Sequence, residues 1–328
     1  MAKRYRYTSR TQTIIVVLIM AIVFFVYSTK IQAQINQRTS LSITPPLSEI
    51  MIKPGKSITQ AFTVKNEGTV DLEVTPSIVD FSPEGESGHP IVLPNNRSFP
   101  FAQLQNLDKA LDKPFVLQKG TSEQLVVRIA VPEQAEEKDY YQTLLLSTKP
   151  INLAELGSST STSYATIGVH MLISVSKTGM DLGSLNIQAF RYPKIVDVFS
   201  PVVMELVAKN NGKTYTKAHG EVSITSFTGT VVKLFPILPE NVLAGSMRRL
   251  HASLPDPEDN KNALSAEFEY RPIVLFGPYT ITVKLFSEQQ QPEERNYSFV
   301  ALPISPALFL GALYITIRIV RKKTKPRV

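Results

Sequence analysis

The sequence predicts an all-β protein that consists of two tandem β-sandwiches. Between the termini it contains many short segments in which apolar and polar residues alternate, separated by turn residues at intervals of about 8–12 positions. In that region it contains no long segment with apolar residues at helical spacing. This combination is typical of sandwiches of the immunoglobulin type, and 328 residues are enough for two of them.

The stretch 50–81 shows the alternation most clearly. The turn pair Pro54-Gly55 leads into one alternating segment, and Asn66-Glu67-Gly68-Thr69 turns the chain into a second. Two strands with one apolar face need a second sheet to cover that face, so this stretch predicts a β-sandwich. The apolar residues that share one parity are Ile58, Phe62 and Val64 in the first segment, and Val70, Leu72 and Val74 in the second.

Similar glycine-led turns precede two later alternating segments. One segment follows Gly120 and the other follows Gly245. Shared β-strand patterning and a duplication of whole domains both explain these repeats, and the sequence leaves the two explanations open. The apolar residues in question are Leu125, Val127, Ile129 and Val131 after the first glycine, and Leu250, Ala252 and Leu254 after the second.

The first sandwich is predicted over residues 40–176 and the second over 182–297, with a short linker that lacks a core pattern. The first opens at 40–52 with an edge strand that Pro45-Pro46 interrupts, because proline cannot donate to a ladder. The second shows the same period of two at Val202, Met204, Leu206, Ala208, Val222, Ile224, Ile281, Val283 and Leu285.

Two tyrosines, Tyr141 and Tyr279, each open a predicted strand after a Gly-Ser-type strand and a proline. A tyrosine corner, in which the hydroxyl bonds to nearby backbone, lies at such a place in immunoglobulin-type sandwiches. An ordinary half-buried tyrosine fits the same pattern. Either role is structural.

The two termini predict where the chain is located. The N-terminal segment, 1–33, combines a basic start, a short apolar run and a small residue, Ala33, so we expect a signal peptide or a retained N-terminal anchor. The segment 299–317 is predicted to be a transmembrane helix, followed by a basic tail, 318–328. The positive-inside rule predicts that this tail is cytoplasmic and that the sandwiches are extracellular, at the cell membrane.

The formal net charge of +7 does not describe the predicted extracellular region. Ten of the 35 Lys and Arg residues lie in the two terminal flanks, which leaves 25 against 28 Asp and Glu. A region with this balance does not support nucleic-acid binding. The absence of Cys excludes disulfides, thiolate nucleophiles and Cys-ligated metal sites.

No motif supports catalysis. Ser174 and Lys177 match a Ser-x-x-Lys motif, and Lys177-Thr178-Gly179 overlaps it, but penicillin-binding enzymes hold these motifs on a helix and a distant strand. The acidic run 256–260 lacks the spacing of a calcium loop. We therefore expect a protein that is not an enzyme and has no cofactor or metal. The histidines, which lack metal-ligand spacing, are His89, His170, His219 and His251.

The insertion 82–114 in the first sandwich is the predicted binding site, because long insertions on a rigid scaffold often carry function. We expect a small hairpin around 91–93 and a short helix near 106–111. The insertion has more apolar residues than a solvated loop needs, and these form the predicted partner-binding set. In the alternative interpretation they close the open end of the sandwich. The set is Ile91, Leu93, Phe99, Phe101 and Leu104.

Three short motifs lie within the first sandwich: Ile52-Lys53-Pro54-Gly55-Lys56-Ser57, Val64-Lys65-Asn66-Glu67-Gly68 and Tyr140-Tyr141-Gln142-Thr143-Leu144-Leu145-Leu146. Together with the order of signal, two sandwiches, membrane span and basic tail, they resemble the WxL-interacting proteins of Gram-positive cell surfaces. The resemblance covers nearly the whole chain as architecture and short patches as sequence. It implies a first domain that binds peptidoglycan and a second that binds a host or partner protein.

These observations predict a membrane-anchored extracellular protein that binds cell-wall polymer or another surface protein. The predicted partners include other immunoglobulin-like or WxL-type proteins in a surface assembly. The alternative is a chaperone-like or assembly subunit that acts by β-strand complementation. A cell-surface hydrolase is the third hypothesis. An open edge strand near 41–44 favours the alternative, whereas a polar, aromatic-lined groove in the insertion favours the first hypothesis.

Overall fold

The computed structural model describes residues 39–151, 165–180, 182–253, 265–288 and 290–323. All of them belong to one compact unit, residues 39–328. The predicted N-terminal segment, 1–33, the acidic run 256–260 and the end of the basic tail lie outside the described residues. Within the described part, the fold is all-β apart from one helix near the C-terminus.

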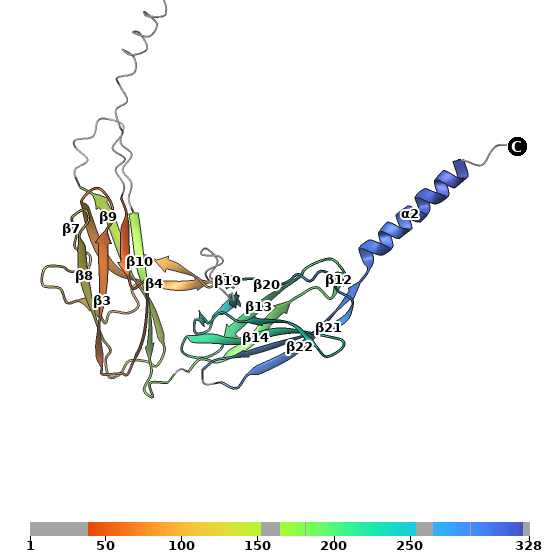
Figure 1. The fold of residues 1–328 in the computed structure, drawn as a ribbon. Helices are drawn as coiled ribbons and strands as arrows, with labels where there is room; N and C mark the ends of the chain where they lie inside the picture. The colour runs from red at the N-terminus through yellow and green to blue at the C-terminus, as the bar shows by residue number, and fades with distance from the viewer. Residues whose placement is uncertain (1–38, 152–164, 181, 254–264, 289, 324–328) are drawn as a thin grey trace, which may run out of the picture. The chain divides into compact units, whose positions relative to one another are not determined.

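The first sandwich contains strands β1 to β10 (Figure 1). One sheet has the order β1-β3-β8-β6, and the other has the order β2-β10-β9-β4-β5, with β7 also paired to β4. The bounds are β1 Leu41–Thr44, β2 Leu47–Ile52, β3 Ser57–Asn66, β4 Leu72–Glu84, β5 His89–Leu93, β6 Ala102–Leu104, β7 Phe115–Leu117, β8 Ser122–Ala130, β9 Asp139–Pro150 and β10 Ala165–Val175.

The second sandwich contains strands β11 to β22 and is followed by helix α2, Ile304–Lys323. One sheet has the order β11-β13-β17, with β20 paired to β13, and the other has the order β12-β22-β21-β14-β15, with β16 paired to β14. The bounds are β11 Leu185–Arg191, β12 Ile195–Asp197, β13 Val202–Asn210, β14 Thr216–Ser226, β15 Val231–Pro236, β16 Glu240–Val242, β17 Met247–Leu250, β18 Ala252–Ser253, β19 Ser265–Ala266, β20 Phe268–Tyr270, β21 Gly277–Phe286 and β22 Glu293–Leu302.

Both sandwiches open with a chain segment that passes from one sheet to the other. In the first, β1 pairs antiparallel with β3, and β2 then pairs parallel with β10. In the second, β11 pairs antiparallel with β13, and β12 then pairs parallel with β22. The predicted break at Pro45-Pro46 is confirmed, and it falls between β1 and β2 at the cis Thr44–Pro45 bond. The two domains therefore open with the same topology.

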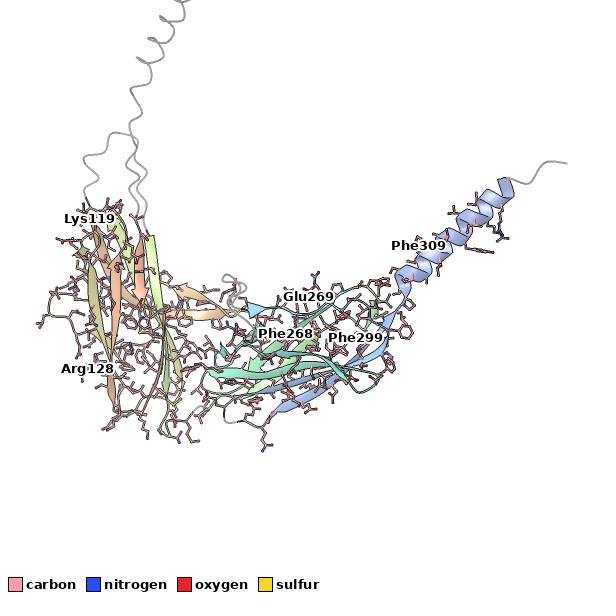
Figure 2. The ribbon with its side chains drawn as sticks, in the orientation of Figure 1. Lys119, Arg128, Phe268, Glu269, Phe299 and Phe309 are labelled. Atoms are coloured by element: carbon pink, nitrogen blue, oxygen red, sulfur yellow. The ribbon has the colours of Figure 1, made fainter. Side chains whose placement is uncertain are left out.

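Each sandwich has its own core, which includes residues predicted from the alternation. Phe62, Val64 and Val127 are 0% exposed in the first core, as predicted. In the second core, Leu206 is 0% exposed, and Phe299 is 1% exposed (Figure 2). Because an apolar side chain that leaves water gains about 1.5–3 kcal/mol, these two faces hold each pair of sheets together.

The predicted helix near 106–111 is wrong, since the structure contains no helix there. The side chain of Asn106 explains the irregular backbone. Its Nδ2 group donates to the carbonyl of Gln124 at 2.8 Å, and its Oδ1 accepts from the amide of Val126 at 2.9 Å. The side chain thus takes the place of a backbone peptide beside β8, which a local helix would prevent.

The predicted transmembrane helix, 299–317, is divided in the structure. Its first residues complete β22, which ends at Leu302, and residues 304–317 lie in α2. Among the described residues, no helix combines the length and the apolar character needed to cross a membrane.

Candidate functional site

Each sandwich has a buried asparagine at the end of an equivalent strand. Asn66 ends β3, Asn210 ends β13, and both are 0% exposed. Each side chain donates from Nδ2 to the carbonyl four residues further on, at 2.8 Å in both cases. Each Oδ1 accepts from the amide two residues further on, that of Gly68 at 3.0 Å and that of Gly212 at 2.8 Å. The asparagines thus fix the same tight turn in both domains.

The glycine-led turns at Gly120 and Gly245 belong to the same repeat. Both glycines have a positive φ, 74° and 71°, which favours glycine. The residue after each glycine accepts from one of the buried asparagines: the amide of Asn66 donates to Thr121 at 3.0 Å, and that of Asn210 donates to Ser246 at 2.9 Å. These repeats are therefore more than shared strand patterning. The turn at Pro54-Gly55 is not equivalent, because it precedes β3, the strand that pairs with β8.

The opening strands of the two sandwiches have the same register. Leu41 of β1 lies opposite Asn66, and Leu185 of β11 lies opposite Asn210. Both pairs are separated by 25 residues of sequence. This constant spacing, with a Leu-x-Ile strand at one end and Lys-Asn at the other, is a signal that our sequence analysis missed.

The outer edge of β1 carries backbone groups that do not face β3. The amide of Glu67 donates to the carbonyl of Ser40 at 2.8 Å, so Ser40 faces β3. In an antiparallel pair this orientation alternates, and Ser42 therefore also faces β3. It follows that Leu41 and Ile43 direct their N–H and C=O groups away from β3. Because β1 ends its sheet, these groups form a free edge with respect to the described residues.

The equivalent edge of β11 is capped by two side chains. Gln290 accepts from the amide of Leu185 at 2.8 Å and donates to the carbonyl of the same residue at 3.0 Å. Glu293 accepts from the amide of Ile187 at 2.8 Å. Both capping residues come from the β21–β22 region, about a hundred residues away in sequence. A further strand cannot bond to β11 at these positions without displacing them.

No described residue forms a hydrogen bond with the outward groups of Leu41 and Ile43. In the first sandwich, the connection that corresponds to the one between β21 and β22 runs from β9 to β10. Residues 152–164 of that connection lie outside the described part of the chain. Within the described part, β1 is thus an open edge and β11 is a closed one.

Strand β2, which ends the other sheet of the first sandwich, contacts the second sandwich. Glu49 accepts from Lys217 at 2.8 Å and from Asn241 at 2.6 Å. Burial alone would raise the pKa of Glu49, but these two hydrogen bonds and the charge of Lys217 outweigh it, and the pKa is lowered. The carboxylate therefore stays ionised and helps to hold this edge against the second domain.

The edges β5 and β15 carry features that discourage strand pairing. Pro90 lies within β5, while β15 contains Lys233, ends at Pro236 and pairs with β14 through a register shift. Proline, lysine and bulges on an edge strand all oppose pairing with another chain. Strand β1, Leu-Ser-Ile-Thr, contains none of them.

The structure does not bring the five predicted partner-binding residues together on one surface. Ile91 and Leu93 lie on β5, whereas Leu104 lies on β6 of the opposite sheet. Ile91 is 44% exposed, but Phe99 is 3% exposed and belongs to the first core. Phe101 and Leu104 are half-buried against that core. The predicted hairpin around 91–93 is confirmed as β4–β5.

The aromatic rings of the insertion pack on one another. Phe99 lies edge-on to Phe101, with 5.0 Å between the ring centroids, and at 4.8 Å from Tyr140. This packing agrees with the alternative interpretation, in which the apolar residues close the sandwich. Phe99 has almost no surface left for a partner.

The tip of the β4–β5 hairpin contacts the second sandwich. Glu86 accepts from both terminal nitrogens of Arg191, at 2.8 and 2.9 Å, and its carbonyl accepts from the amide of Arg249 at 2.6 Å. The hydrogen bonds from Arg191 lower the pKa of Glu86. Because Arg191 ends β11, the hairpin holds the far end of the capped strand.

Tyr141 contacts the second sandwich instead of forming a tyrosine corner. Its hydroxyl donates to Asp139 at 2.6 Å and accepts from the amide of Ala244 at 2.7 Å. Burial and the neighbouring carboxylate raise its pKa, so the phenol stays protonated. Tyr279, in contrast, accepts from the amide of Phe276, three residues upstream, as a tyrosine corner predicts.

The Ser-x-x-Lys motif does not form a nucleophile–base pair. Ser174 is buried and donates to Asp139 at 2.5 Å, while Lys177 forms an exposed ion pair with Glu137 at 3.5 Å. Elsewhere, His170 donates to or accepts from Thr143 at 3.0 Å, and burial lowers its pKa. Among the described residues, no three His, Asp or Glu side chains are grouped so that they could hold a metal ion.

Comparisons with known proteins identify no family. No family model matches the chain, and no curated protein matches it. Solved structures with a similar arrangement include the class 5 fimbriae chaperone CfaA (TM-score 0.37, 11% identity, covering 80% of this chain and 100% of that chain). They also include the Salmonella enterica SafA pilin in complex with the SafB chaperone (0.36, 10%, 80% and 97%) and the E. coli chaperone DraB (0.34, 12%, 80% and 96%). At TM-scores this low, the likeness does not carry a function over to this chain.

Proposed function

We propose that this chain is a chaperone-like or assembly protein that binds an extended segment of another protein along β1. The observation that carries the proposal is the free edge formed by Leu41 and Ile43, next to a domain whose equivalent edge is capped. An open first edge strand is the feature that distinguishes strand complementation from binding through the insertion.

The chemistry of β1 suits the addition of a strand. Each of the two outward residues offers one donor and one acceptor, and a peptide hydrogen bond contributes about 0.5–1.5 kcal/mol net. Ile43 is 8% exposed, so its side chain already lies in the core. An added strand therefore gains main-chain bonds at a rigid edge, and alternate side chains of that strand supply the specificity.

On this proposal the partner is another surface protein rather than peptidoglycan, and the chain binds without catalysis outside the cell. Membership of the WxL-interacting proteins, an extracellular location and the role of Ile91 as a contact remain predictions. The insertion supports the proposal only indirectly, since most of its predicted contact residues pack against the core.

Site-specific photo-crosslinking in cells tests the proposal. A photoreactive phenylalanine replaces Ser42 on β1 in one variant and Asn186 at the equivalent position of β11 in the matched control. A third variant carries it at Ile91, which is exposed on β5. We expect an adduct with another protein at position 42 and none at 186.

Equal adducts at 42 and 186 would show that the open edge has no special role. An adduct at 91 alone would return the binding site to the insertion, as first predicted. Mass spectrometry of the adduct identifies the partner segment, which the proposal requires to be extended and rich in alternating apolar residues.

A further inference from the structure

The second sandwich has an apolar surface at the end from which α2 leaves. We call this surface the apolar cap. Its side chains come from three separate connections and are unusually exposed for their type. The members, with their exposed fractions, are Phe199 (61%), Phe227 (65%), Ile273 (93%), Val274 (55%) and Phe276 (65%).

Hydrogen bonds and close contacts bring these connections together. The amide of Leu275 donates to Val198 at 2.8 Å, and the amide of Val198 donates to Leu302 at 3.1 Å, which joins two of the connections to the end of β22. The third connection lies alongside, since a Cβ placed on Gly277 would be 3.5 Å from the ring of Phe227. The cap is therefore one surface.

The first turn of α2 is fixed to the same end of the domain. Asp197 accepts from the amide of Ser305 at 2.7 Å and from its hydroxyl at 2.8 Å. These bonds lower the pKa of Asp197 and satisfy a free amide at the helix start. The cap and the beginning of α2 are thus held as neighbours.

The first part of α2, residues 304–317, carries no charged residue and exposes apolar side chains on all sides. Leu308, Phe309 and Leu310 are 69%, 69% and 62% exposed, and successive residues of a helix point about 100° apart. Figure 2 shows Phe309 projecting from α2. A protein partner that packs on one face would leave the others in water. The end of α2 is basic, with Arg318 and Arg321, and the helix contains no acidic residue.

We infer that the apolar cap inserts into the surface of a lipid bilayer beside α2. A lipid surface can contact the exposed apolar side chains of the helix and of the cap at the same time, which a single protein groove cannot. The basic residues that follow complement anionic head groups. Apolar side chains can insert to the level of the lipid head groups without any part of the protein crossing the membrane. This surface is independent of the edge of β1, and it places the second sandwich against lipid.

Fluorescence of single tryptophans tests the inference, because the full chain contains no tryptophan. Phe276→Trp reports on the cap and Phe309→Trp reports on α2. Leu107→Trp, at a fully exposed position of the first sandwich, is the control. Each variant is reconstituted with vesicles of phosphatidylcholine and phosphatidylglycerol, with and without brominated acyl chains. We expect a shift to shorter wavelength and quenching at 276 and 309, but not at 107.

An unchanged emission at 276, whatever happens at 309, overturns the inference, because the cap would then stay in water. Equal shifts at all three positions also overturn it, since they indicate unspecific adsorption. A second test replaces Phe199, Phe227 and Phe276 with serine and leaves α2 intact. Vesicle partitioning should fall at least about tenfold, because burying one phenylalanine is worth roughly that factor. The opposite result would be that the unsubstituted chain forms a dimer without vesicles, that the serine variants do not, and that vesicle partitioning is unchanged. In that case a second copy of the chain, and not lipid, covers the apolar cap.

Discussion

The opening strands β1 and β11 have the same topology, the same register and the same buried asparagine opposite their first residue, yet they differ at their outer edge. Gln290 and Glu293 occupy the outward groups of β11, whereas no described residue occupies those of β1. The fold is therefore compatible with both states. In β11 the capping bonds come from only two side chains.

An uncapped strand edge favours unspecific pairing with other chains, and proteins commonly block such edges. Among the described edges, β5 contains a proline, β15 combines a lysine, a proline and a register shift, and β2 contacts the second sandwich. If the proposal is correct, the difference between β1 and β11 means that an unpaired strand edge locates the binding site better than exposed apolar residues such as Ile91 do.

The largest expected effect is the loss of stability when one equivalent core residue is truncated in each domain, which tests whether the two cores are equivalent. Phe62 and Leu206 lie four residues before the buried asparagines, and both are 0% exposed. Phe62→Ala should lower the free energy of unfolding by about 3–5 kcal/mol and Leu206→Ala by about 2–5 kcal/mol. Urea denaturation of the full chain measures both. A change of less than half a kcal/mol (roughly the range of a surface substitution) would mean that the register is misassigned.

The buried asparagines should produce the next largest effect, of the same size in both domains. Asn66→Ala and Asn210→Ala each remove two donors from buried carbonyls and should cost about 2–4 kcal/mol. Lys65→Ala and Lys209→Ala, one residue earlier and on the opposite face of each strand, are controls. A large cost in one domain only would break the equivalence on which the comparison rests.

Removing the cap of β11 should convert it into an open edge. Gln290→Ala combined with Glu293→Ala leaves the outward groups of Leu185 and Ile187 without their partners, at a cost of about 1–2 kcal/mol. We expect photo-crosslinking at position 186 to rise to the level at position 42. If the double variant still gives no adduct at position 186, an open strand edge alone is not sufficient for binding.

The smallest effect concerns the ion pair that holds the far end of β11. The pKa of Glu86 is lowered by its hydrogen bonds with Arg191, so its contribution is present at neutral pH and is lost as pH falls through this lowered pKa. Glu86→Gln should therefore lower the thermal midpoint of unfolding near neutral pH and leave it equal to that of the wild type in acid. Glu84→Gln is the control. A difference that persists in acid would assign the effect to packing.

Much of the fold follows from sequence because the strand residues of both cores keep a period of two. Val127, Leu206 and Ala208 are buried as this period predicts. The helix expected near 106–111 failed because the side chain of Asn106 replaces a peptide group, and this contact is not local. Ile58 keeps the apolar parity but is 40% exposed, since it lies at the start of β3 away from the core.

The candidate site was harder to predict. Phe99 lies in a segment that the sequence predicts to be a binding insertion, but it belongs to the core because Phe101 and Tyr140 pack around it. The caps Gln290 and Glu293 lie about a hundred residues from the strand that they protect, and no periodicity links them. Only the repeated spacing between the first strand and the buried asparagine was available from sequence.

Amide hydrogen exchange of the isolated full chain, read residue by residue, tests the open and capped edges most directly. The amides of Leu185 and Ile187 should be protected by their side-chain acceptors, while those of Leu41 and Ile43 should exchange at rates near those of unstructured backbone. Addition of the crosslinked partner segment should protect Leu41 and Ile43 and leave Leu185 unchanged. Equal protection of all four amides in the isolated chain would contradict the account, because β1 would then have no free edge to offer.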